Sequence, residues 1–341
     1  MSGRLKLEIR VNRLKIIPEA PVNNVQTDAF NAAAAVEHSS GTGPRFSFII
    51  VSYNTLSLTR NAIASICRYA GGAVHEIIVV DNGSTDNSVA VLRGEFPHLR
   101  LIELGCNRGF AAANNAGARV ARGEWLILLN SDAELLAASL PEVDRLLTQH
   151  PQIDVLGAQL LNADGSLQGS VFNERRTFRF EERHQQRELV QVLGIVGAFM
   201  VIRHALWQRL GGMDEEYFFY FEEADFCRRA TDAGAVVRWS PRVRVTHHRG
   251  GSVGRSNSRA QIEYWRGKHL YWRKSRPPVA YRLLCARALL GVLFNFAGNS
   301  LLCLLALGRS RKILNRFRSY ALILAWHCRG CPAGWGLRPD E

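Results

Sequence analysis

Three short polar segments, each directly after a run of apolar residues, are the part of the chain best suited to chemistry. They are 52–54 (Ser-Tyr-Asn), 81–82 (Asp-Asn) and 130–132 (Asn-Ser-Asp). Short apolar runs bounded by turn-forming residues are typical of buried strands in a parallel sheet. Ligands of such sheets bind beyond the carboxyl ends of the strands. The pattern therefore predicts a binding site with a carboxylate at Asp132, although a lone Asp after a strand also serves as a helix N-cap.

A phosphate-bearing ligand would need a counter-charge from this site. The sequence has neither a G-x-x-x-x-G-K-[ST] loop nor a G-x-G-x-x-G turn after a strand. A divalent metal ion on Asp132 would supply the charge, because Mg²⁺ binds through one or two carboxylates together with substrate phosphates. Such an ion acts as a Lewis acid that neutralises a departing pyrophosphate.

A second group of acids, Glu222, Glu223 and Asp225, stands at the expected start of a helix. Adjacent residues on a helix diverge by about 100°, so the three cannot all face one site. The cluster either supplies a general base or is an acidic first turn that favours the helix dipole. The aromatic residues 217–221 before it either stack on a sugar or belong to the core.

The elements that must position these residues follow a β-α-β-α-β-α-β order, which specifies a parallel sheet with right-handed crossovers. The expected strands are 48–51, 76–80, 99–104 and 125–129, and the expected helices include 55–69 and 110–122. The second half is less regular, with expected strands at 153–161, 236–239 and 243–246, helices at 140–150 and 203–210, and a long loop at 174–188. Residues 1–44 have the composition of a linker.

The composition describes a globular protein with an uneven charge distribution. Of 341 residues 47% are hydrophobic and 21% charged, and the net charge is +13. Between Cys227 and Arg276 there are thirteen Lys or Arg residues and two acids. Such a basic stretch faces nucleic acid, an anionic membrane surface or a polyphosphate ligand. Seven scattered cysteines without framework spacing predict a reducing compartment.

Residues 288–307 carry no charge and are long enough to cross a membrane. Asn295, Asn299 and Ser300 interrupt this stretch and basic residues flank it, which also fits a helix at the membrane interface. A buried helical hairpin of a soluble protein is the third possibility. We expect membrane association, with the choice between spanning and surface binding open.

An ordered series of motifs resembles that of family 2 inverting glycosyltransferases, in particular bacterial rhamnosyltransferase-like enzymes of surface polysaccharide synthesis. The motifs lie at 51–54, 80–86, 107–111, 114–117, 129–132, 197–200, 211–214, 218–229 and 247–248. The resemblance covers roughly 46–251. It implies an α/β GT-A fold, a Rossmann-like and mostly parallel sheet flanked by helices, at 45–255. An extension (1–44) would precede this domain and a basic, apolar helical region (256–341) would follow it.

The resemblance implies that the donor, a nucleotide sugar, lies along the sheet edge. The residues it assigns to donor binding are Ser52, Tyr53, Asn54, Asp81, Asn82, Asn107, Arg108, Asn114, Asn130, Ser131 and Asp132. Tyr53 and Asp81 would contact the base and ribose. Asn130 stands where the family's D-x-D motif has its first Asp, which leaves Asp132 as the main carboxylate and makes Mn²⁺ an alternative to Mg²⁺. His248, rather than His247, is the expected imidazole ligand, and imidazole suits Mn²⁺ better than Mg²⁺.

For the transfer step the resemblance implies that Glu223 is the base that takes the proton of the acceptor hydroxyl. Asp225 is expected to assist catalysis or to bind acceptor hydroxyls, with pairing to Arg228 or Arg229 as its alternative. Glu222 is expected on the acceptor side.

The expected function is therefore transfer of a sugar, with dTDP-rhamnose as the first choice of donor, to a lipid-linked glycan acceptor. The expected location is the cytoplasmic face of the inner membrane. A UDP-hexose-dependent exopolysaccharide transferase is the enzymatic alternative. A non-catalytic basic module that binds nucleic acid or membrane is the alternative from another class, although we expect no nucleic-acid partner.

Overall fold

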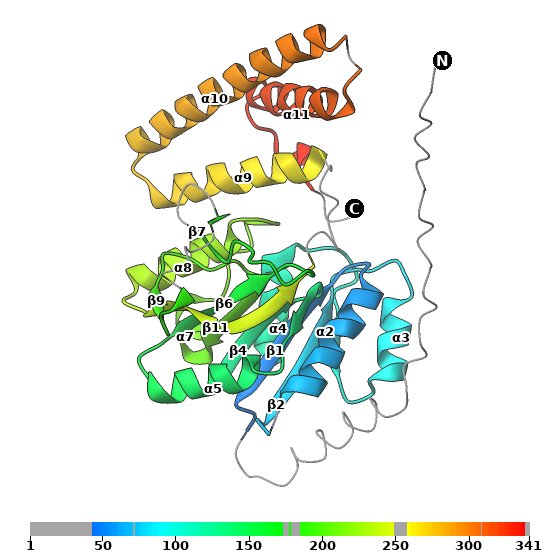
Figure 1. Cartoon of the computed structure of the whole chain (residues 1–341), viewed down its shortest axis with the longest axis vertical. Coiled ribbons are helices and arrows are strands. Elements are labelled where there is room, and N and C mark those ends of the chain that lie inside the picture. Colours follow the sequence, from blue (N-terminus) through cyan, green and yellow to red (C-terminus); the bar gives the residue numbers. More distant parts are fainter. Residues whose placement is uncertain are drawn as a thin grey trace, which may run out of the picture.

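A computed structural model describes residues 43–70, 72–172, 177–178, 185–248, 258–307 and 309–337. Within them a nine-stranded sheet runs in the order β3-β2-β1-β4-β10-β6-β11-β5, and β9 pairs with β11 beside this path (Figure 1). Helices cover both faces of the sheet. The expected α/β architecture with a helix-flanked sheet is confirmed. The sheet is mixed rather than mostly parallel, because four strand pairings are parallel and four are antiparallel.

The first half of the sheet is parallel throughout, as predicted. Its strands are β1 (Phe46–Ser52), β2 (His75–Asp81), β3 (Arg100–Glu103) and β4 (Trp125–Asn130). The connecting helices are α2 (Leu56–Tyr69), α3 (Ser88–Glu95) and α4 (Phe110–Val120). β1 lies between β2 and β4 and pairs with both in parallel. The carboxyl ends of these three strands therefore lie at one edge of the sheet.

The second half is mixed. It contains β5 (Ala133–Leu135), β6 (Val155–Leu161), β9 (Val190–Gln191), β10 (Phe199–Arg203) and β11 (Val237–His247), with a separate small hairpin of β7 (Val171–Phe172) and β8 (Thr177–Phe178). Its helices are α5 (Ser139–Gln149), α7 (His204–Leu210) and α8 (Glu222–Asp232). β10 runs antiparallel to β4, and β5 runs antiparallel to β11.

Several features of this half differ from the prediction. β7, β8, β9 and β10 were not among the expected strands. The short strand β5 was not predicted, because three residues are too few for a periodicity signal. The strands expected at 236–239 and 243–246 form one strand, β11, whose register shifts between Ser240 and Arg244. Pro241 lies within that shift and cannot donate a ladder hydrogen bond, so the strand bulges there.

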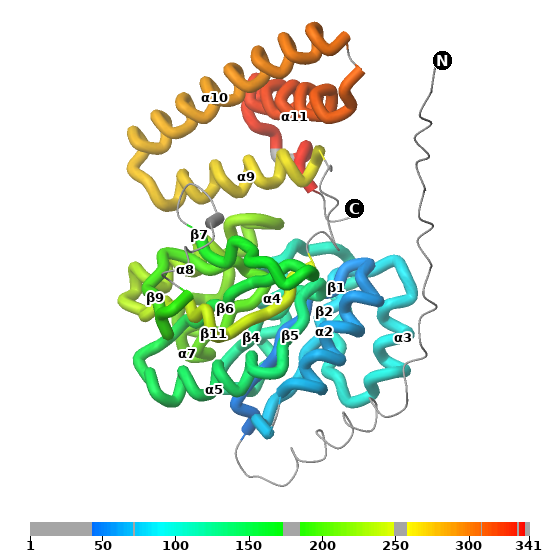
Figure 2. Tube along the Cα trace, in the orientation of Figure 1, coloured from blue at the N-terminus to red at the C-terminus, as the bar shows by residue number. Residues whose placement is uncertain are grey.

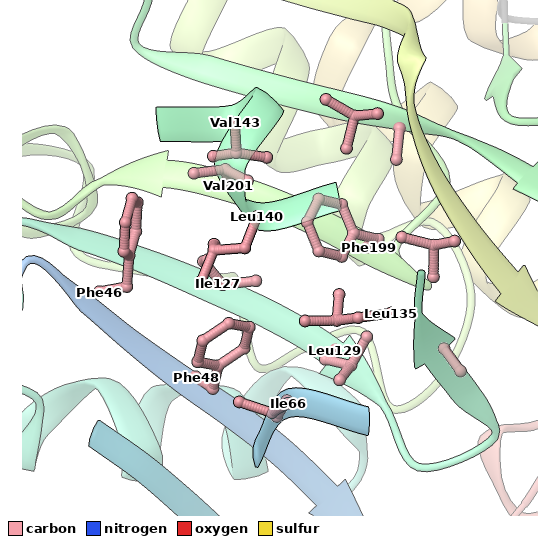
Figure 3. Close-up of a cluster of buried hydrophobic side chains, with 14 of the residues drawn as sticks. Phe46, Phe48, Ile66, Ile127, Leu129, Leu135, Leu140, Val143, Phe199 and Val201 are labelled. Atoms are coloured by element: carbon pink, nitrogen blue, oxygen red, sulfur yellow. The ribbon is translucent and has the colours of Figure 1, made fainter. Parts of the chain in front are cut away.

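Two hydrophobic layers hold the helices on the sheet. One joins Phe46, Phe48 and Ile50 of β1 to α2 and α5 (Figure 3). The other joins Ile49 of β1 to α4, α7 and α8. Side chains of a strand alternate between faces, so one strand supplies both layers. A sheet covered on both faces leaves its edge as the place for a ligand.

Three helices follow the sheet: α9 (Ser258–Ser275), α10 (Pro278–Leu305) and α11 (Arg311–Cys328), with a short 3₁₀ turn, η1 (Ala333–Trp335). α9 lies next to the α/β part, and α10 and α11 pack side by side beyond it (Figure 2). In the part of the chain that the structure describes, α10 alone is long and apolar enough to cross a membrane. Its exposed apolar residues include Leu290 (66%) and Phe294 (81%).

The expected extension lies outside the described residues, apart from positions 43 and 44. Most of the expected loop at 174–188 also lies outside them, as does the basic stretch at 249–257.

Candidate active site

The three polar segments meet at one edge of the sheet, as predicted. Ser52 of β1 pairs in register with Asp81 of β2, and Val51 pairs with Asn130 of β4. On the far side of β4 the Asn130 N–H donates to the carbonyl oxygen of Ala198 at 3.1 Å. The segment before β10 therefore borders the same edge.

Asp81 has one oxygen engaged and one available. Its Oδ2 accepts the backbone N–H groups of Gly83 (3.2 Å) and Ser84 (3.0 Å). Its Oδ1 is buried and has no hydrogen-bond partner. Leaving a buried acceptor unpaired costs about 1–3 kcal/mol. A donor group of a ligand, such as a ribose hydroxyl, would remove that cost.

Ser52 and Asn54 reach the expected edge, but their side chains hold loops. The Ser52 hydroxyl bonds to Thr59 Oγ1 at 2.9 Å inside the first turn of α2. Asn54 Oδ1 accepts the N–H groups of Thr85 (2.8 Å) and Asp86 (3.3 Å). Both side chains therefore support the loops of the site, and their expected contact with the donor stays a prediction. Tyr53 stands between them, half-buried.

The loop before α4 is fastened to Asn82. Asn82 Nδ2 donates to Asn107 Oδ1 at 2.9 Å, and Asn82 Oδ1 accepts the backbone N–H of Arg108 at 2.9 Å. The Arg108 side chain is exposed at the rim. Asn114, in contrast, is 1% exposed and donates to the Phe110 carbonyl oxygen of its own helix. Asn114 is thus hydrogen-bonded within α4, and its expected place in the lining of the donor pocket stays a prediction.

Asp132 faces His247 across the end of the sheet. Asp132 Oδ1 lies 3.3 Å from His247 Nε2, and Ser131 Oγ nearby accepts from Thr55 Oγ1 at 3.2 Å. Gln168 Nε2 donates to the His247 carbonyl oxygen, which turns Gln168 Oε1 toward His247 Nδ1 at 3.1 Å. His247 thus presents Nδ1 to Gln168 and Nε2 to the Asp132 carboxylate. A proton or a metal ion shared by Nε2 and the carboxylate would make this contact favourable.

The expected imidazole ligand, His248, lies farther from the Asp132 carboxylate contact than its neighbour His247. His248 donates its backbone N–H to the Asp132 carbonyl oxygen at 2.9 Å, but its ring turns away. His248 Nε2 lies 2.9 Å from Glu134 Oε1, and both side chains are about one-third exposed. The pairing of β11 with β5 thus brings both histidines to Asp132 and leaves His247 with the contact.

Glu222 and Glu223 form a buried acid pair at the start of α8. Burial raises the pKa of both carboxyl groups above their usual range, and the charge of Glu223 raises that of Glu222 further. Backbone amide groups of Gly197 and Phe221 stabilise ionised Glu223. Glu223 is therefore the member that ionises first, and its Oε2 is buried without a partner. An atom of this kind accepts a proton from a bound hydroxyl.

The acid pair adjoins the sheet edge through the segment before β10. A Cβ atom on Gly197 would lie 3.6 Å from Glu223 Cβ, and Ala198, the next residue, accepts the Asn130 N–H. The expected donor and acceptor residues thus come from separate parts of the chain and lie around one place.

Asp225 forms ion pairs with both Arg228 and Arg229, the alternative expected for it from the sequence. Its Oδ1 accepts from Arg228 at 2.8 Å and its Oδ2 from Arg229 at 2.6 Å, while the side chain is 1% exposed. Both oxygens are therefore engaged in ion pairs that hold α8, and the expected catalytic and acceptor-binding roles of Asp225 stay predictions.

Replacement of Asp225 should strongly destabilise the fold. Asp225→Asn leaves two arginines without their buried carboxylate, and breaking a buried ion pair typically costs about 3–5 kcal/mol. Asp232→Asn is the matched control, because Asp232 also pairs with Arg228 but is 65% exposed. We expect less than about 1 kcal/mol for the control. Urea unfolding measures both, and equal losses would contradict the ion-pair assignment.

The turn before α8 is strained. Tyr220 (φ 71°) and Phe221 (φ 74°) both adopt left-handed backbone conformations that are unfavourable for aromatic residues. Such strain persists only where surrounding contacts enforce it and gathers at functional sites. Here the turn sets the direction in which Glu222 and Glu223 leave the backbone.

Comparison with known proteins identifies the family of part of this chain. Residues 47–211 match the model of glycosyl transferase family 2. The chain contains a family 2 glycosyltransferase domain. The acid pair, His247 and α9 lie beyond the matched segment.

Relatives of this glycosyltransferase act in the assembly of surface glycans, according to their names. It is 25% identical over 209 residues to the N-acetylglucosaminyl-diphospho-decaprenol L-rhamnosyltransferase of Mycobacterium tuberculosis, covering 52% of this chain and 68% of the relative. It is 26% identical over 239 residues to the O-antigen biosynthesis protein RfbC of Myxococcus xanthus, covering 65% of this chain and 18% of that protein. Much of the latter relative has no counterpart in this chain.

A solved structure shares the fold of the glycosyltransferase. The crystal structure of GalNAc-T7 with UDP, GalNAc and Mn²⁺ matches with a TM-score of 0.54 and 14% identity, covering 85% of this chain and 57% of that one. At this identity the likeness concerns the fold alone.

Two residues beside the glycosyltransferase site were missed by the sequence reasoning. Gln168 orients His247, but it lies in a segment without a motif. Glu263 of α9 is buried next to the acid pair. Glu263 could have been noticed because it is one of only two acids among thirteen basic residues between Cys227 and Arg276. The net charge of that stretch does not reveal it.

Proposed function

We propose that this protein is an inverting glycosyltransferase that moves a sugar from a nucleotide donor to a lipid-linked glycan during surface polysaccharide synthesis. L-Rhamnose from dTDP-rhamnose is the proposed donor sugar, and a GlcNAc-diphospho-polyprenol is the proposed acceptor class, both suggested by the name of the mycobacterial relative. The observation that carries the proposal is the unpartnered, buried Oε2 of Glu223 beside the edge that holds Asp81 and Asp132.

In the proposed reaction the acceptor hydroxyl attacks the anomeric carbon from the face opposite the nucleotide. The new carbon–oxygen bond forms as the bond to the diphosphate breaks, and the diphosphate leaves with the bonding electrons. The hydroxyl proton passes to Glu223. Glu222 keeps its own proton because burial and the neighbouring charge raise its pKa well above the usual range. It can therefore donate a hydrogen bond to the acceptor without competing as a base.

Asp132 and His247 fit a divalent metal ion, because His247 Nε2 and the Asp132 carboxylate face each other. Among the described residues no group of three or more His, Cys, Asp or Glu forms a complete metal site. The proposal therefore leaves the remaining positions to the donor diphosphate and water. The mixed nitrogen and oxygen ligands favour Mn²⁺ over Mg²⁺. When bound, the ion would offset the charge of the departing diphosphate.

Membrane association is proposed for α10 and α11. Two polar side chains of α10 form hydrogen bonds within the helix. Asn295 donates to the Gly291 carbonyl oxygen and Asn299 donates to the Asn295 carbonyl oxygen, each at 2.7 Å. Exposed apolar residues along α10 would contact lipid, while Arg316 and Arg318 of α11 would contact anionic headgroups. Co-sedimentation with vesicles of phosphatidylglycerol tests this part separately. Phe294→Glu should weaken the binding, and unchanged binding would contradict it.

A donor screen tests the transferase proposal. We expect dTDP-rhamnose with Mn²⁺ to raise the melting temperature, since a ligand that binds only the folded state stabilises it. It should also release dTDP when a GlcNAc-diphosphate lipid is added. Asp132→Ala should lose both responses. Release of UDP from a UDP-hexose would replace the proposed donor, whereas no stabilisation and no release with any sugar nucleotide would exclude the transferase.

A further inference from the structure

A third carboxyl group, that of Glu263, lies buried beside the acid pair. It belongs to α9, and its side chain is 1% exposed. Neither of its oxygens accepts a hydrogen bond of ordinary geometry, although the backbone of Phe219 and Leu337 lies close enough to favour the charged form. The nearest cation is Arg266, whose Nε lies 3.5 Å from Glu263 Oε1. A buried acid with so little compensation is costly unless it serves the group that faces it.

Glu263 faces the turn that carries the acid pair. Its charge raises the pKa of Glu222. The Tyr220 hydroxyl lies within the field of all three acids, since Glu222, Glu223 and Glu263 each raise its pKa after the larger effect of burial. Two parts of the chain, the start of α8 and the middle of α9, thus bring three carboxyl groups around one strained turn.

Close contacts hold α9 against this turn. A Cβ atom on Gly267 would lie 2.6 Å from the Tyr220 carbonyl oxygen, so glycine allows the helix to approach the strained backbone directly. The Tyr264 ring contacts the rings of Tyr220 (5.8 Å between centroids) and Phe221 (5.2 Å). Glu263 lies in the same turn of α9. Its distance from the acid pair is therefore fixed by packing.

Glu263 changes its protonation state near neutral pH. Burial raises the pKa of Glu263 to about 7, against the opposing charge of Arg266 and the nearby backbone of Leu337 and Phe219. The charged and titratable groups around it are Glu222 and Glu223 of α8, Tyr220 of the turn, and Arg266 and Tyr264 of α9.

We propose that Glu263 is a positioning residue whose negative charge, held against the strained turn by α9, sets the proton affinity of the Glu222–Glu223 pair. This inference rests on the proposed role of Glu223 as the base. A like charge nearby disfavours ionisation and raises a carboxyl pKa. Glu263 thereby raises the pKa of Glu222 directly. Because two interacting carboxyl groups titrate as a pair, the pair as a whole requires a higher pH to lose its first proton.

The test compares pH profiles of kcat/KM for two substitutions that separate charge from packing. Glu263→Gln keeps the shape and removes the charge. The acid limb should move to lower pH by at least about 0.5 unit, and the plateau rate should fall several-fold. Glu263→Asp keeps the charge and shortens the side chain, so its limb should stay within about 0.2 unit of wild type. Donor KM should change in neither.

Glu216→Gln is the matched control. Glu216 also interacts with α9, through Lys274 and Arg273, but it is 57% exposed, so the loss of its charge should leave the limb in place. Glu263→Met, neutral and similar in length, replaces Glu263→Gln if that variant does not melt cooperatively.

An acid limb of Glu263→Gln at the wild-type pH would overturn the inference. So would an equal shift in Glu263→Asp, or failure of both neutral variants to fold, since each outcome indicates a packing role. A wild type without transfer to any acceptor would instead overturn the proposed function on which the inference rests.

Discussion

Glu223→Gln should lower kcat by about 10²–10⁴-fold, the usual contribution of a positioned general base. The amide has nearly the shape of the carboxyl group but cannot take the acceptor proton. Donor affinity should stay within about twofold, because Glu223 reaches the site from α8 and the donor residues follow β1, β2 and β4. Single-turnover transfer with saturating donor measures the chemical step, and a thermal shift with donor measures binding.

Glu216→Gln serves as the control here too, since it removes an exposed acid six residues before the pair. If Glu223→Gln transferred sugar at the wild-type rate, the base would have to be sought elsewhere. Glu222→Gln would be the next variant to measure.

His247→Ala should raise the Mn²⁺ concentration for half-maximal activity by at least about 10–100-fold, the range seen when even the outer partners of a metal site are lost. His248→Ala should leave it unchanged, because the His248 ring pairs with Glu134 at the surface. The two variants differ by one position, at the end of β11 and directly after it, and remove the same group. Titration of activity with Mn²⁺ after treatment with a chelator distinguishes them.

A larger effect of His248→Ala would restore the original expectation and contradict the contact between His247 and Asp132. Gln168→Ala offers an independent check. It should weaken Mn²⁺ less than His247→Ala, since the ring would lose only its partner at Nδ1.

The parallel half of the fold could be predicted because each local signal agreed with the next. The continuous apolar runs ending at Ser52, Asp81 and Asn130 gave both the strands and the edge at which they meet. The mixed half could not be derived in the same way. An antiparallel strand such as β10 is chosen by its partners in space, and a three-residue strand such as β5 exists only because β11 lies beside it.

The site was predictable to the level of segments, but not to the level of atoms. The sequence predicted that two histidines lie near Asp132. The choice between them depends on Gln168, which is 79 positions from His247 in the chain. Sequence likewise placed three acids at the start of α8. Only the packing distinguishes Asp225, whose oxygens are occupied by two arginines, from Glu223, which keeps one unpartnered oxygen.

Along the chain, the antiparallel strand β10 separates the residues expected at the donor from those expected at the acceptor. The residues expected to contact the donor sugar and nucleotide precede it, whereas Glu222, Glu223, Glu263 and the proposed metal ligand His247 follow it. A chimera joined in the segment between β6 and β10 should therefore combine the donor preference of one relative with the acceptor preference of another. The strained turn and α9 then come from the same parent, so their contact is kept.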